Sequence, residues 1–501
     1  MFATVDRSSA SLARKILSFM KPERVLLLAV LVGGTLAILR SVPLILLPYQ
    51  IDYGEGLMLE GATRIRHSQP LYPNPFSFPI IVHDWGPVAY AAAALVLPDG
   101  EASFPAGRLL VLLSSVLLAF LLSGIQRSCT GSWCTGLSFG LLLLTLPAFR
   151  FWLYLLRTDV IGVLLSTIGV MLYVLDGKRW HWSVLFFWLA IFCKYTLIAA
   201  PLAVFIHLLL NRKVRQGLGF AAALGSACVL AFLILQIVTG HWFAFHMFST
   251  HSDCYSLVQF FALAALVWAS APVVTALAVW YVAQDFRGSR KSFAPVYFVT
   301  SSVTALSAGK LGSTTNHFLE CMVASCLCAG LGYSLLMSKH AAKIVPVSAL
   351  LSVSVLVAVG TQNRSSLQPS RGLAECREAY QFVSSSPSAR VLSESLGPLL
   401  MARKPILISD PFVYGQALQH GLWPDRKVER LLHGKYFGLV VLANDPVQMK
   451  LRGSAVWPES LIDAVQQNYR VVHRFNCRDS AVMLEPVPSS QAHDNSPGSP
   501  E

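Results

Sequence analysis

Charged residues are scarce in this chain of 501 residues, of which 13% are charged and 54% are hydrophobic. Because an average soluble protein has about a quarter of its residues charged, this composition excludes a chain that is soluble throughout. The apolar residues gather in runs between Val25 and Gly360, whereas residues Thr361 to Glu501 resemble a soluble domain in charge, proline and serine content. The sequence therefore predicts a mainly α, polytopic membrane body, residues 25–360, followed by a C-terminal domain.

Several chemical motifs are missing too. The ten cysteines form no CxxC pair and no Cys/His spacing suited to zinc. The polar turn from Gly309 to His317 lacks the GxxxxGK[ST] order of a phosphate-binding P-loop, so a nucleotide site is not indicated. We expect no cofactor, and the sequence offers no support for a divalent metal. Cys376 and Cys477 are a candidate disulfide pair, since both are expected outside the cytoplasm.

A cleavage site is absent from the first apolar run, Val25 to Pro48, which is also too long for a signal-peptide core. We interpret it as an uncleaved membrane anchor. The basic residues before it are Arg7, Arg14, Lys15, Lys21 and Arg24. By the positive-inside rule they place residues 1–24 in the cytoplasm.

The next segment, residues 49–107, is long, polar and proline-rich, and its one apolar piece is Gly86 to Leu97. At about 1.5 Å per residue, twelve residues reach only about 18 Å, short of a hydrocarbon core of about 30 Å. We interpret this piece as re-entrant or interfacial and the whole segment as a first outer loop. Ten further spans are predicted, about eleven in all: 108–125, 133–149, 160–175, 182–193, 196–210, 216–239, 257–283, 293–308, 318–337 and 344–360.

Lysine and arginine outnumber the acidic residues by 39 to 26, an excess that is found in proteins that bind nucleic acid. Here the basic clusters lie between the apolar runs and do not line one polar face, so no nucleic-acid partner is expected. Every predicted inner turn is basic, through Arg127; Lys178 and Arg179; Arg212, Lys213 and Arg215; Arg287, Arg290 and Lys291; and Lys339 and Lys343. A membrane crossing at residues 86–97 would turn all five outward, against the positive-inside rule.

With this topology, acids and cations from separate segments meet on the outer side. Ionisable groups at membrane depth are costly unless they face a cavity or a partner, although span ends also carry polar residues for no further reason. Asp52 can cap a helix over residues 55–67, and with Glu55 it could converge on one point and supply a general base. The alternative is a capping Asp and a first-turn Glu that the helix dipole favours.

Several cations accompany these acids. Arg157 could clasp a phosphate through its guanidinium, or simply pair with Asp159. Lys194 and Lys310 are further cations at span ends. His241, His246 and His251 recur at five-residue steps, which suits donors to a phosphate or sugar, or interface residues, better than metal ligands. Acids and cations without a nucleotide fold suit a donor whose leaving group is an anionic lipid phosphate.

Five short motifs occur in one order: Asp52-Tyr53-Gly54-Glu55-Gly56, Gln69 to Pro73 with Trp85 to Tyr90, Arg157-Thr158-Asp159, Lys194-Tyr195-Thr196 with Ala200 to Ala203, and Gly312 to Glu320. In these motifs the chain resembles bacterial members of the GT-C superfamily, which includes protein O-mannosyltransferases and the aminoarabinose transferase of lipid A. The resemblance implies a GT-C-like fold in the bacterial inner membrane. It also implies inverting transfer of a sugar from a polyprenyl-phosphate donor, with a first-loop carboxylate as base. The chain departs from the family's "YPPLY" region, which reads His83-Asp84-Trp85-Gly86-Pro87 here.

These expectations combine into one hypothesis. Asp52, with Glu55 beside it, would remove a proton from a glycan, lipid or protein acceptor on the extracytoplasmic face. The predicted phosphate-binding residues are Arg157, Lys194, Lys310, His241 and His251, and the further site candidates are Asp159, His83, Asp84, Asn316, His317 and Glu320. One rival is a transporter or flippase of lipid-linked intermediates, which requires charges buried in mid-span. The other is a non-catalytic envelope protein, in which Asp52 and Arg157 would lie more than about 12 Å apart.

The C-terminal region, residues 361–486, predicts a small extracytoplasmic α/β domain. Its expected strands are residues 389–393, 405–409 and 437–442, and its expected helices are residues 413–420 and 427–433. Asp410, Tyr414 and Trp423 are candidates for contact with an acceptor. Residues 487–501 are rich in Ser, Pro and Asp and predict a disordered tail.

Overall fold

A computed structural model of the chain describes residues 21–98, 101–175, 180–249, 255–288, 291–361, 370–423, 425–454, 456–477 and 482–488. These residues divide into two compact units. The membrane unit comprises the described parts of Met1–Tyr72, Asp84–Phe248 and Asp253–Pro369, and the C-terminal unit comprises those of Pro73–His83, Ser249–Ser252 and Ser370–Glu501.

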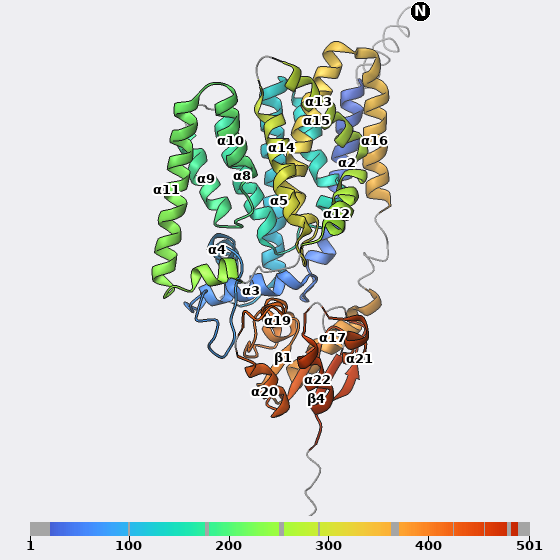
Figure 1. Cartoon of the computed structure of the whole chain (residues 1–501). Coiled ribbons are helices and arrows are strands. Elements are labelled where there is room, and N and C mark those ends of the chain that lie inside the picture. Colours follow the sequence, from blue (N-terminus) through green and yellow to red (C-terminus); the bar gives the residue numbers. More distant parts are fainter. Residues whose placement is uncertain are drawn as a thin grey trace, which may run out of the picture. The chain divides into compact units, whose positions relative to one another are not determined.

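The membrane unit is built of helices, as the apolar runs predict (Figure 1). Its α-helices are α2 (Pro22–Ile45), α3 (Tyr53–Arg66), α4 (Pro87–Leu95), α5 (Phe104–Thr130), α6 (Trp133–Leu141), α7 (Pro147–Arg150), α8 (Thr158–Leu175), α9 (Trp180–Ile191), α10 (Ala199–Leu210), α11 (Val214–Val238), α12 (Leu257–Ala269), α13 (Pro272–Arg287), α14 (Phe293–Thr304), α15 (Leu319–Lys339) and α16 (Ile344–Gly360). Short helical turns are η2 (Leu142–Thr145), η3 (Phe245–Ser249), η4 (Ala305–Gly309), η5 (Thr315–Phe318) and η6 (Ala341–Lys343). Helix α2 packs beside α16, and α8 beside α5 and α9.

Within the described residues, six helices are long and apolar enough to cross a membrane: α2, α5, α8, α11, η5 with α15, and η6 with α16. Three apolar helices are shorter: α6 with η2, α9 and α10. The predicted span 257–283 is wrong as a single helix, because α12 and α13 meet there at 97°. Pro272 begins α13, and a proline removes a backbone donor and disfavours helical dihedrals in the residue before it. The count of eleven spans is therefore not confirmed.

Helix α4 has nine residues, which at about 1.5 Å per residue is too short to cross a bilayer of about 30 Å. It packs against α3, where the ring of Tyr90 covers Gly61 so closely that a Cβ there would overlap it. Helix α3 is buried on all sides from Gly54 to Ala62, so its start is enclosed by protein.

The C-terminal unit holds a small four-stranded sheet covered by helices. Its elements are α17 (Ser370–Ser385), β1 (Val391–Ser393), α18 (Gly397–Met401), α19 (Pro411–Gln419), α20 (Lys427–His433), β2 (Leu439–Leu442), α21 (Pro446–Arg452), α22 (Glu459–Asn468), β3 (Tyr469–Arg474) and β4 (Val482–Pro486). The strand order is β1-β2-β4-β3, with β1 and β2 parallel and the other pairs antiparallel. The predicted strands at 389–393 and 437–442 contain β1 and β2, and the predicted helix 427–433 is α20.

The predicted strand 405–409 does not join this sheet. Ile408 forms an isolated parallel bridge with Ile80, from the first outer loop. The hydroxyl of Ser409 donates to the carbonyl of Val82 (2.9 Å) and accepts from its N–H (2.7 Å). Part of the first loop is thus an element of the C-terminal unit, a pairing across 327 residues that no local pattern indicates.

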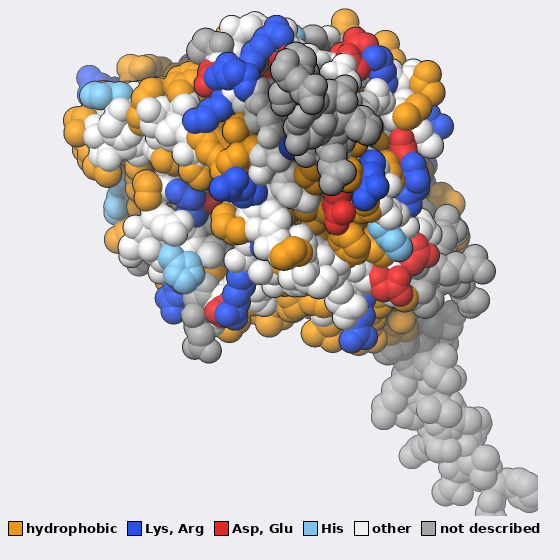
Figure 2. All heavy atoms as spheres, turned by 90° about the horizontal axis from the view of Figure 1, so that it is seen from below, with side chains coloured by type: hydrophobic (Ala, Val, Ile, Leu, Met, Phe, Trp, Pro, Cys, Tyr) orange, Lys and Arg blue, Asp and Glu red, His pale blue; other side chains and the backbone are white. Residues whose placement is uncertain are grey.

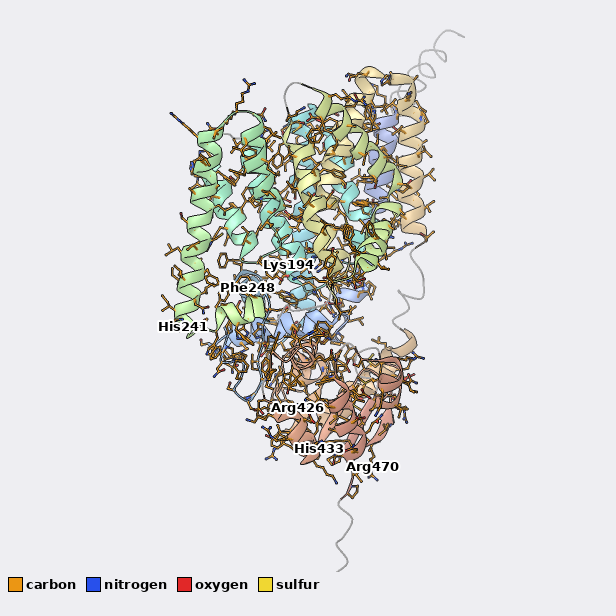
Figure 3. The ribbon with its side chains drawn as sticks, viewed as in Figure 1. Lys194, His241, Phe248, Arg426, His433 and Arg470 are labelled. Atoms are coloured by element: carbon orange, nitrogen blue, oxygen red, sulfur yellow. A yellow bond between two sulfur atoms is a disulfide. The ribbon has the colours of Figure 1, made fainter. Side chains whose placement is uncertain are left out.

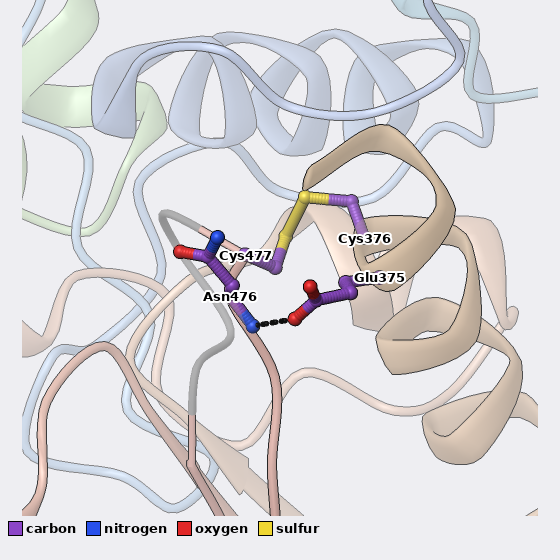
Figure 4. Close-up of a disulfide and its surroundings, with 4 residues drawn as sticks. All are labelled: Glu375, Cys376, Asn476 and Cys477. Atoms are coloured by element: carbon purple, nitrogen blue, oxygen red, sulfur yellow. Dashed lines mark hydrogen bonds between the residues drawn. A yellow bond between two sulfur atoms is a disulfide. The ribbon is translucent and has the colours of Figure 1, made fainter. Parts of the chain in front are cut away.

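Cys376 of α17 and Cys477, just after β3, form a disulfide in the C-terminal unit (Figure 4). Beside it, the N–H of Asn476 donates to the carboxylate of Glu375. The bond closes a loop of 101 residues that contains most of the sheet.

We expect Cys376→Ser to lower the free energy of unfolding of the C-terminal unit by about 2–4 kcal/mol, because the bond restricts the unfolded chain. Thermal unfolding of the full-length protein measures this loss. Cys477→Ser and the double variant should show the same loss, since all three changes remove one bond. Cys129→Ser, at an exposed free cysteine, is the control and should change little. A double variant much less stable than either single variant would contradict the pairing.

Candidate functional site

Asp52 opens the site at the start of α3. Its backbone is extended (φ −129°, ψ 142°), and its Oδ1 accepts from the N–H of Gly54 at 3.0 Å, which caps the helix. The Nη1 of Arg157 donates to the same oxygen at 2.7 Å. Within the described residues Oδ2 has no hydrogen-bond partner, and the side chain is 21% exposed. Asp52 is thus held through one oxygen while the other stays accessible.

Glu55 does not converge with Asp52, although the two form a capping box. Its carboxylate is fully buried and lies against the guanidinium of Arg108, with Nε to Oε1 at 2.8 Å and Nη2 to Oε2 at 2.7 Å. Backbone N–H groups of Ile51, Asp52 and Leu156 also donate to it. With both oxygens occupied and no exposed surface, Glu55 is a structural anchor in this geometry.

Arg108 is the residue that the sequence patterns missed. Besides Glu55, its guanidinium donates to three backbone carbonyls, that of Leu44 (3.1 Å) in the last turn of α2 and those of Leu47 (2.6 Å) and Tyr49 (2.6 Å) before α3. It therefore ties the end of α2 and the start of α3 to α5. The only sequence signal was one arginine at the edge of an apolar run.

Arg157 lies between two carboxylates, just before α8. It pairs with Asp52 and approaches Asp159, with 3.6 Å between its Nε and Oδ2 of Asp159. The indole rings of Trp85 and Trp152 lie 4.9 and 5.8 Å from its guanidinium carbon. Partial burial alone would lower the pKa of Arg157, but the carboxylates of Asp52 and Asp159 raise it above its usual value, so the cation is firmly charged.

Asp159, in the first turn of α8, continues the chain of charges inward. Its Oδ1 accepts from Lys194 at 2.5 Å and from the amide of Asn316 at 2.9 Å. The side chains of Asp159 and Lys194 are 2% and 9% exposed, whereas Asp52 and Arg157 are more open. Figure 3 labels Lys194 near the lower ends of the helices of the membrane unit. Asp52, Arg157, Asp159, Lys194 and Asn316 therefore form one connected cluster, which we call the charge relay.

A polar pocket adjoins the buried end of the charge relay. Asp159, Lys194, Asn316, His317 and Glu320 line it. Its volume of about 10 Å³ is close to the minimum of about 10–15 Å³ that one water molecule needs. His317 pairs through Nδ1 with the hydroxyl of Ser307 (2.7 Å), and Glu320 accepts from Ser166 (2.7 Å).

Lys310 follows η4 next to this pocket, and its backbone bridges to Tyr255. Gln259 of α12 donates to the carbonyls of Ala308 (3.0 Å) and Lys310 (2.6 Å) and so holds the turn in place. Lys310 and His317 are close enough to interact electrostatically.

Other predicted site residues are not part of the charge relay. His241 follows the end of α11 with a left-handed backbone (φ 72°) and lies away from Lys194 in Figure 3, and its contact with the donor phosphate stays a prediction. His246 is buried beside the ring of Tyr72. His251 lies outside the described residues. His83 is buried in the C-terminal unit, whereas Asp84 is in the membrane unit and interacts electrostatically with Arg157.

The three candidates for acceptor contact in the C-terminal unit are buried. Tyr414 is fully buried and Trp423 is 5% exposed, and their rings pack at 5.4 Å. Asp410 caps α19 by accepting from the N–H of Val413 at 3.0 Å. These three side chains build the core of this unit and offer little surface to an acceptor. No group of three His, Cys, Asp or Glu side chains that could hold a metal occurs in the described part of either unit.

Two solved structures are similar to this chain over most of its length. One is ArnT from Cupriavidus metallidurans bound to undecaprenyl phosphate, with a TM-score of 0.63, 13% identity, and coverage of 92% of this chain and 98% of ArnT. The other is the same ArnT in the apo state, with a TM-score of 0.60, 12% identity, and coverage of 90% and 97%. The chain has the ArnT fold. No protein-family model and no curated protein sequence matches it.

The ArnT fold confirms the GT-C-like architecture that the five motifs predict, because ArnT is the aminoarabinose transferase of that superfamily. Together with the apolar helices, this fold supports the prediction of an integral membrane protein. At 13% identity the likeness extends to the fold alone. The chemistry has to be argued from the charge relay.

Proposed function

We propose that this protein is a glycosyltransferase that moves a sugar from a polyprenyl-phosphate donor to an acceptor on the extracytoplasmic face of the bacterial inner membrane. The observation that carries the proposal is the charge relay. Its partly exposed pair, Asp52 and Arg157, lies next to its buried pair, Asp159 and Lys194. The ArnT that shares this fold binds undecaprenyl phosphate, which supports a polyprenyl-phosphate donor here.

Asp52 is the proposed general base. The acceptor hydroxyl or amine would approach Oδ2, since Oδ1 is occupied by Arg157 and the helix cap. As the acceptor attacks the anomeric carbon, its proton passes to Oδ2 and a new bond forms from the acceptor to that carbon. The bond from the anomeric carbon to the phosphate oxygen breaks, and polyprenyl phosphate leaves. One displacement of this kind inverts the anomeric configuration.

Arg157 is the proposed partner of the donor phosphate. Its Nη1 holds Asp52, and the guanidinium has further N–H groups that can donate to a phosphate oxygen. Lys194 adds a buried positive charge that Asp159 and Asn316 hold in place. Positioned cations stabilise the charge that develops on a leaving phosphate, which is the largest catalytic contribution in many enzymes. Lys310 is the proposed second cation at the pocket.

The proposed partners are the lipid donor, an acceptor that is a glycan, lipid or protein, and the surrounding membrane lipids. In Figure 2, lysine and arginine side chains are scattered among acidic and apolar ones. Nucleic-acid binding relies on a basic patch or stripe, and the described residues of that face show no such concentration.

Reconstituted protein tests the proposal when it is given polyprenyl-phosphate-linked labelled sugars together with cell-envelope extracts as acceptors. The expected result is release of polyprenyl phosphate and a product whose anomeric configuration is inverted. Movement of the intact lipid-linked sugar across the bilayer without release would favour a transporter instead. The buried carboxylates Asp159 and Glu320 lie in the first turns of α8 and α15, not in mid-span as a transporter would require.

Gly54 provides a test of the Arg157 position. A Cβ at Gly54 would overlap the guanidinium of Arg157, so Gly54→Ala should push Arg157 away from Asp52. Overpacking of this kind costs about 1–3 kcal/mol, and we expect undecaprenyl phosphate to bind about tenfold more weakly. Gly124→Ala in α5 is the matched control, since its Cβ meets no atom within 4 Å. Equal binding by the Gly54→Ala variant and the parent would show that Arg157 does not hold the phosphate.

A further inference from the structure

A second and larger cavity lies in the membrane unit, at the opposite helix ends from the charge relay. Asp159 lies in the first turn of α8, and Tyr173, which lines the cavity, is fourteen residues further along the same helix. At about 1.5 Å per residue this separates the two sites by about 21 Å. Likewise, His207 lines the cavity near the end of α10.

The cavity has a volume of about 400 Å³, within the range of about 300–1,000 Å³ that is typical of ligand sites. Its inner wall is apolar and is formed by the buried side chains of Val204, Leu208, Phe220 and Phe293. Beside these, the hydroxyl of Tyr173 pairs with Nδ1 of His207 at 2.6 Å. The wall can therefore hold a hydrocarbon chain.

The rim of the cavity is polar and basic. Lys213 and Gln216 are exposed there, on either side of the start of α11. Within the described residues the Lys213 ammonium has no ion-pair partner, and the first turn of α11 contains no acidic residue. Asp285, which interacts electrostatically with His207, accepts from the hydroxyl and N–H of Ser292. Among the residues that the structure describes, the rim thus presents a positive charge that is not paired with a carboxylate.

The outer side of α11 faces away from the rest of the unit and exposes large apolar side chains, among them Leu218, Val229 and Leu233. Only 11% of an 18-residue apolar stretch of this helix is buried, so its surface is suited to contact with lipid. Basic pockets between transmembrane helices on the cytoplasmic side bind the head groups of acidic lipids. The basic inner turns predict that this end of α11 is the cytoplasmic one.

We propose that this cavity binds an acidic phospholipid, with an acyl chain against Val204 and Phe220 and the phosphate at Lys213. The site would take lipid from the inner leaflet and is separate from the donor phosphate site at Arg157. It does not depend on the proposed transferase activity.

Native mass spectrometry of the delipidated full-length protein in detergent tests the site, with phosphatidylglycerol and phosphatidylcholine of identical chains as probes. We expect phosphatidylglycerol to bind about fivefold more tightly, the effect of about one cation near a phosphate. Lys213→Gln should remove this preference. Lys343→Gln, at another exposed lysine, should retain it. Val174→Trp, which fills the cavity, should weaken the binding of both lipids.

Glycerol phosphate separates a lipid site from a site for free phosphate. In large molar excess it should fail to displace phosphatidylglycerol, because it lacks the acyl chain that the apolar wall holds. Equal binding of the two lipids would overturn the proposal, as would displacement by glycerol phosphate. So would an equal loss of preference in the Lys343→Gln variant, which would indicate unspecific attraction to surface charge. No sugar donor is present, so a failure here leaves the proposed transferase activity untouched.

Discussion

Asp52→Asn is expected to lower the rate of sugar transfer by about 10²–10⁴-fold, the contribution typical of a general base. The amide cannot take up a proton at Oδ2, where the acceptor would approach. The fold should persist, since Asn caps a helix as well as Asp does. Arg157 also keeps Asp159 as a partner, so its charge stays compensated. Binding of undecaprenyl phosphate should therefore be nearly unchanged.

Two further variants separate the role of Asp52 as a general base from its role as a helix cap. Asp52→Ala removes both and should also lose about 0.5–2 kcal/mol of stability. Asp445→Asn is the matched control, because Asp445 caps α21 through the N–H of Val447 (3.0 Å) and pairs with Arg474 (2.6 Å). It should leave transfer unchanged. If the Asp52→Asn protein transfers sugar at the parental rate, Asp52 is only a cap. A parallel loss of lipid binding would make it a positioning residue.

The common location of the acids and cations was predictable, because it depends on features that are local in sequence. Apolar run lengths and the charge of the turns between them predict which ends of the helices meet. The 2.7 Å contact between Asp52 and Arg157 agrees with that expectation and excludes the separation of about 12 Å that the non-catalytic alternative requires.

The partners of individual side chains were not predictable from spacing. Asp52 and Glu55, three residues apart, were expected to converge. The extended backbone of Asp52 instead directs it to Arg157, and Glu55 turns to Arg108, 53 residues away. The prediction for the strand 405–409 failed for the same reason, because Ile408 pairs with Ile80 instead of joining the sheet. Contacts that are remote in sequence leave no periodic signal, so only the three-dimensional structure reveals them.

Arg108→Met is expected to lower the stability of the membrane unit by about 3–5 kcal/mol, since it leaves the buried Glu55 carboxylate without its cation. Arg127→Met is the matched control on the same helix, α5. Arg127 is exposed and lies over the ring of Trp133 at 4.2 Å, so its loss should cost no more than about 1 kcal/mol. Thermal unfolding in detergent compares the two variants.

Glu55→Gln distinguishes an anchor from a base. Because the fully buried Glu55 carboxylate accepts five hydrogen bonds, the variant should lose stability yet still transfer sugar at temperatures where it is folded. A stable, inactive Glu55→Gln protein would instead make Glu55 the base.

The double variant Arg108→Met, Glu55→Met removes both charges, and replacing a buried ion pair by apolar residues is often harmless. Here it should recover only part of the loss, because the carbonyls of Leu44, Leu47 and Tyr49 still lack their donor. Full recovery would mean that Arg108 only neutralises Glu55 and does not position the loop that carries Asp52.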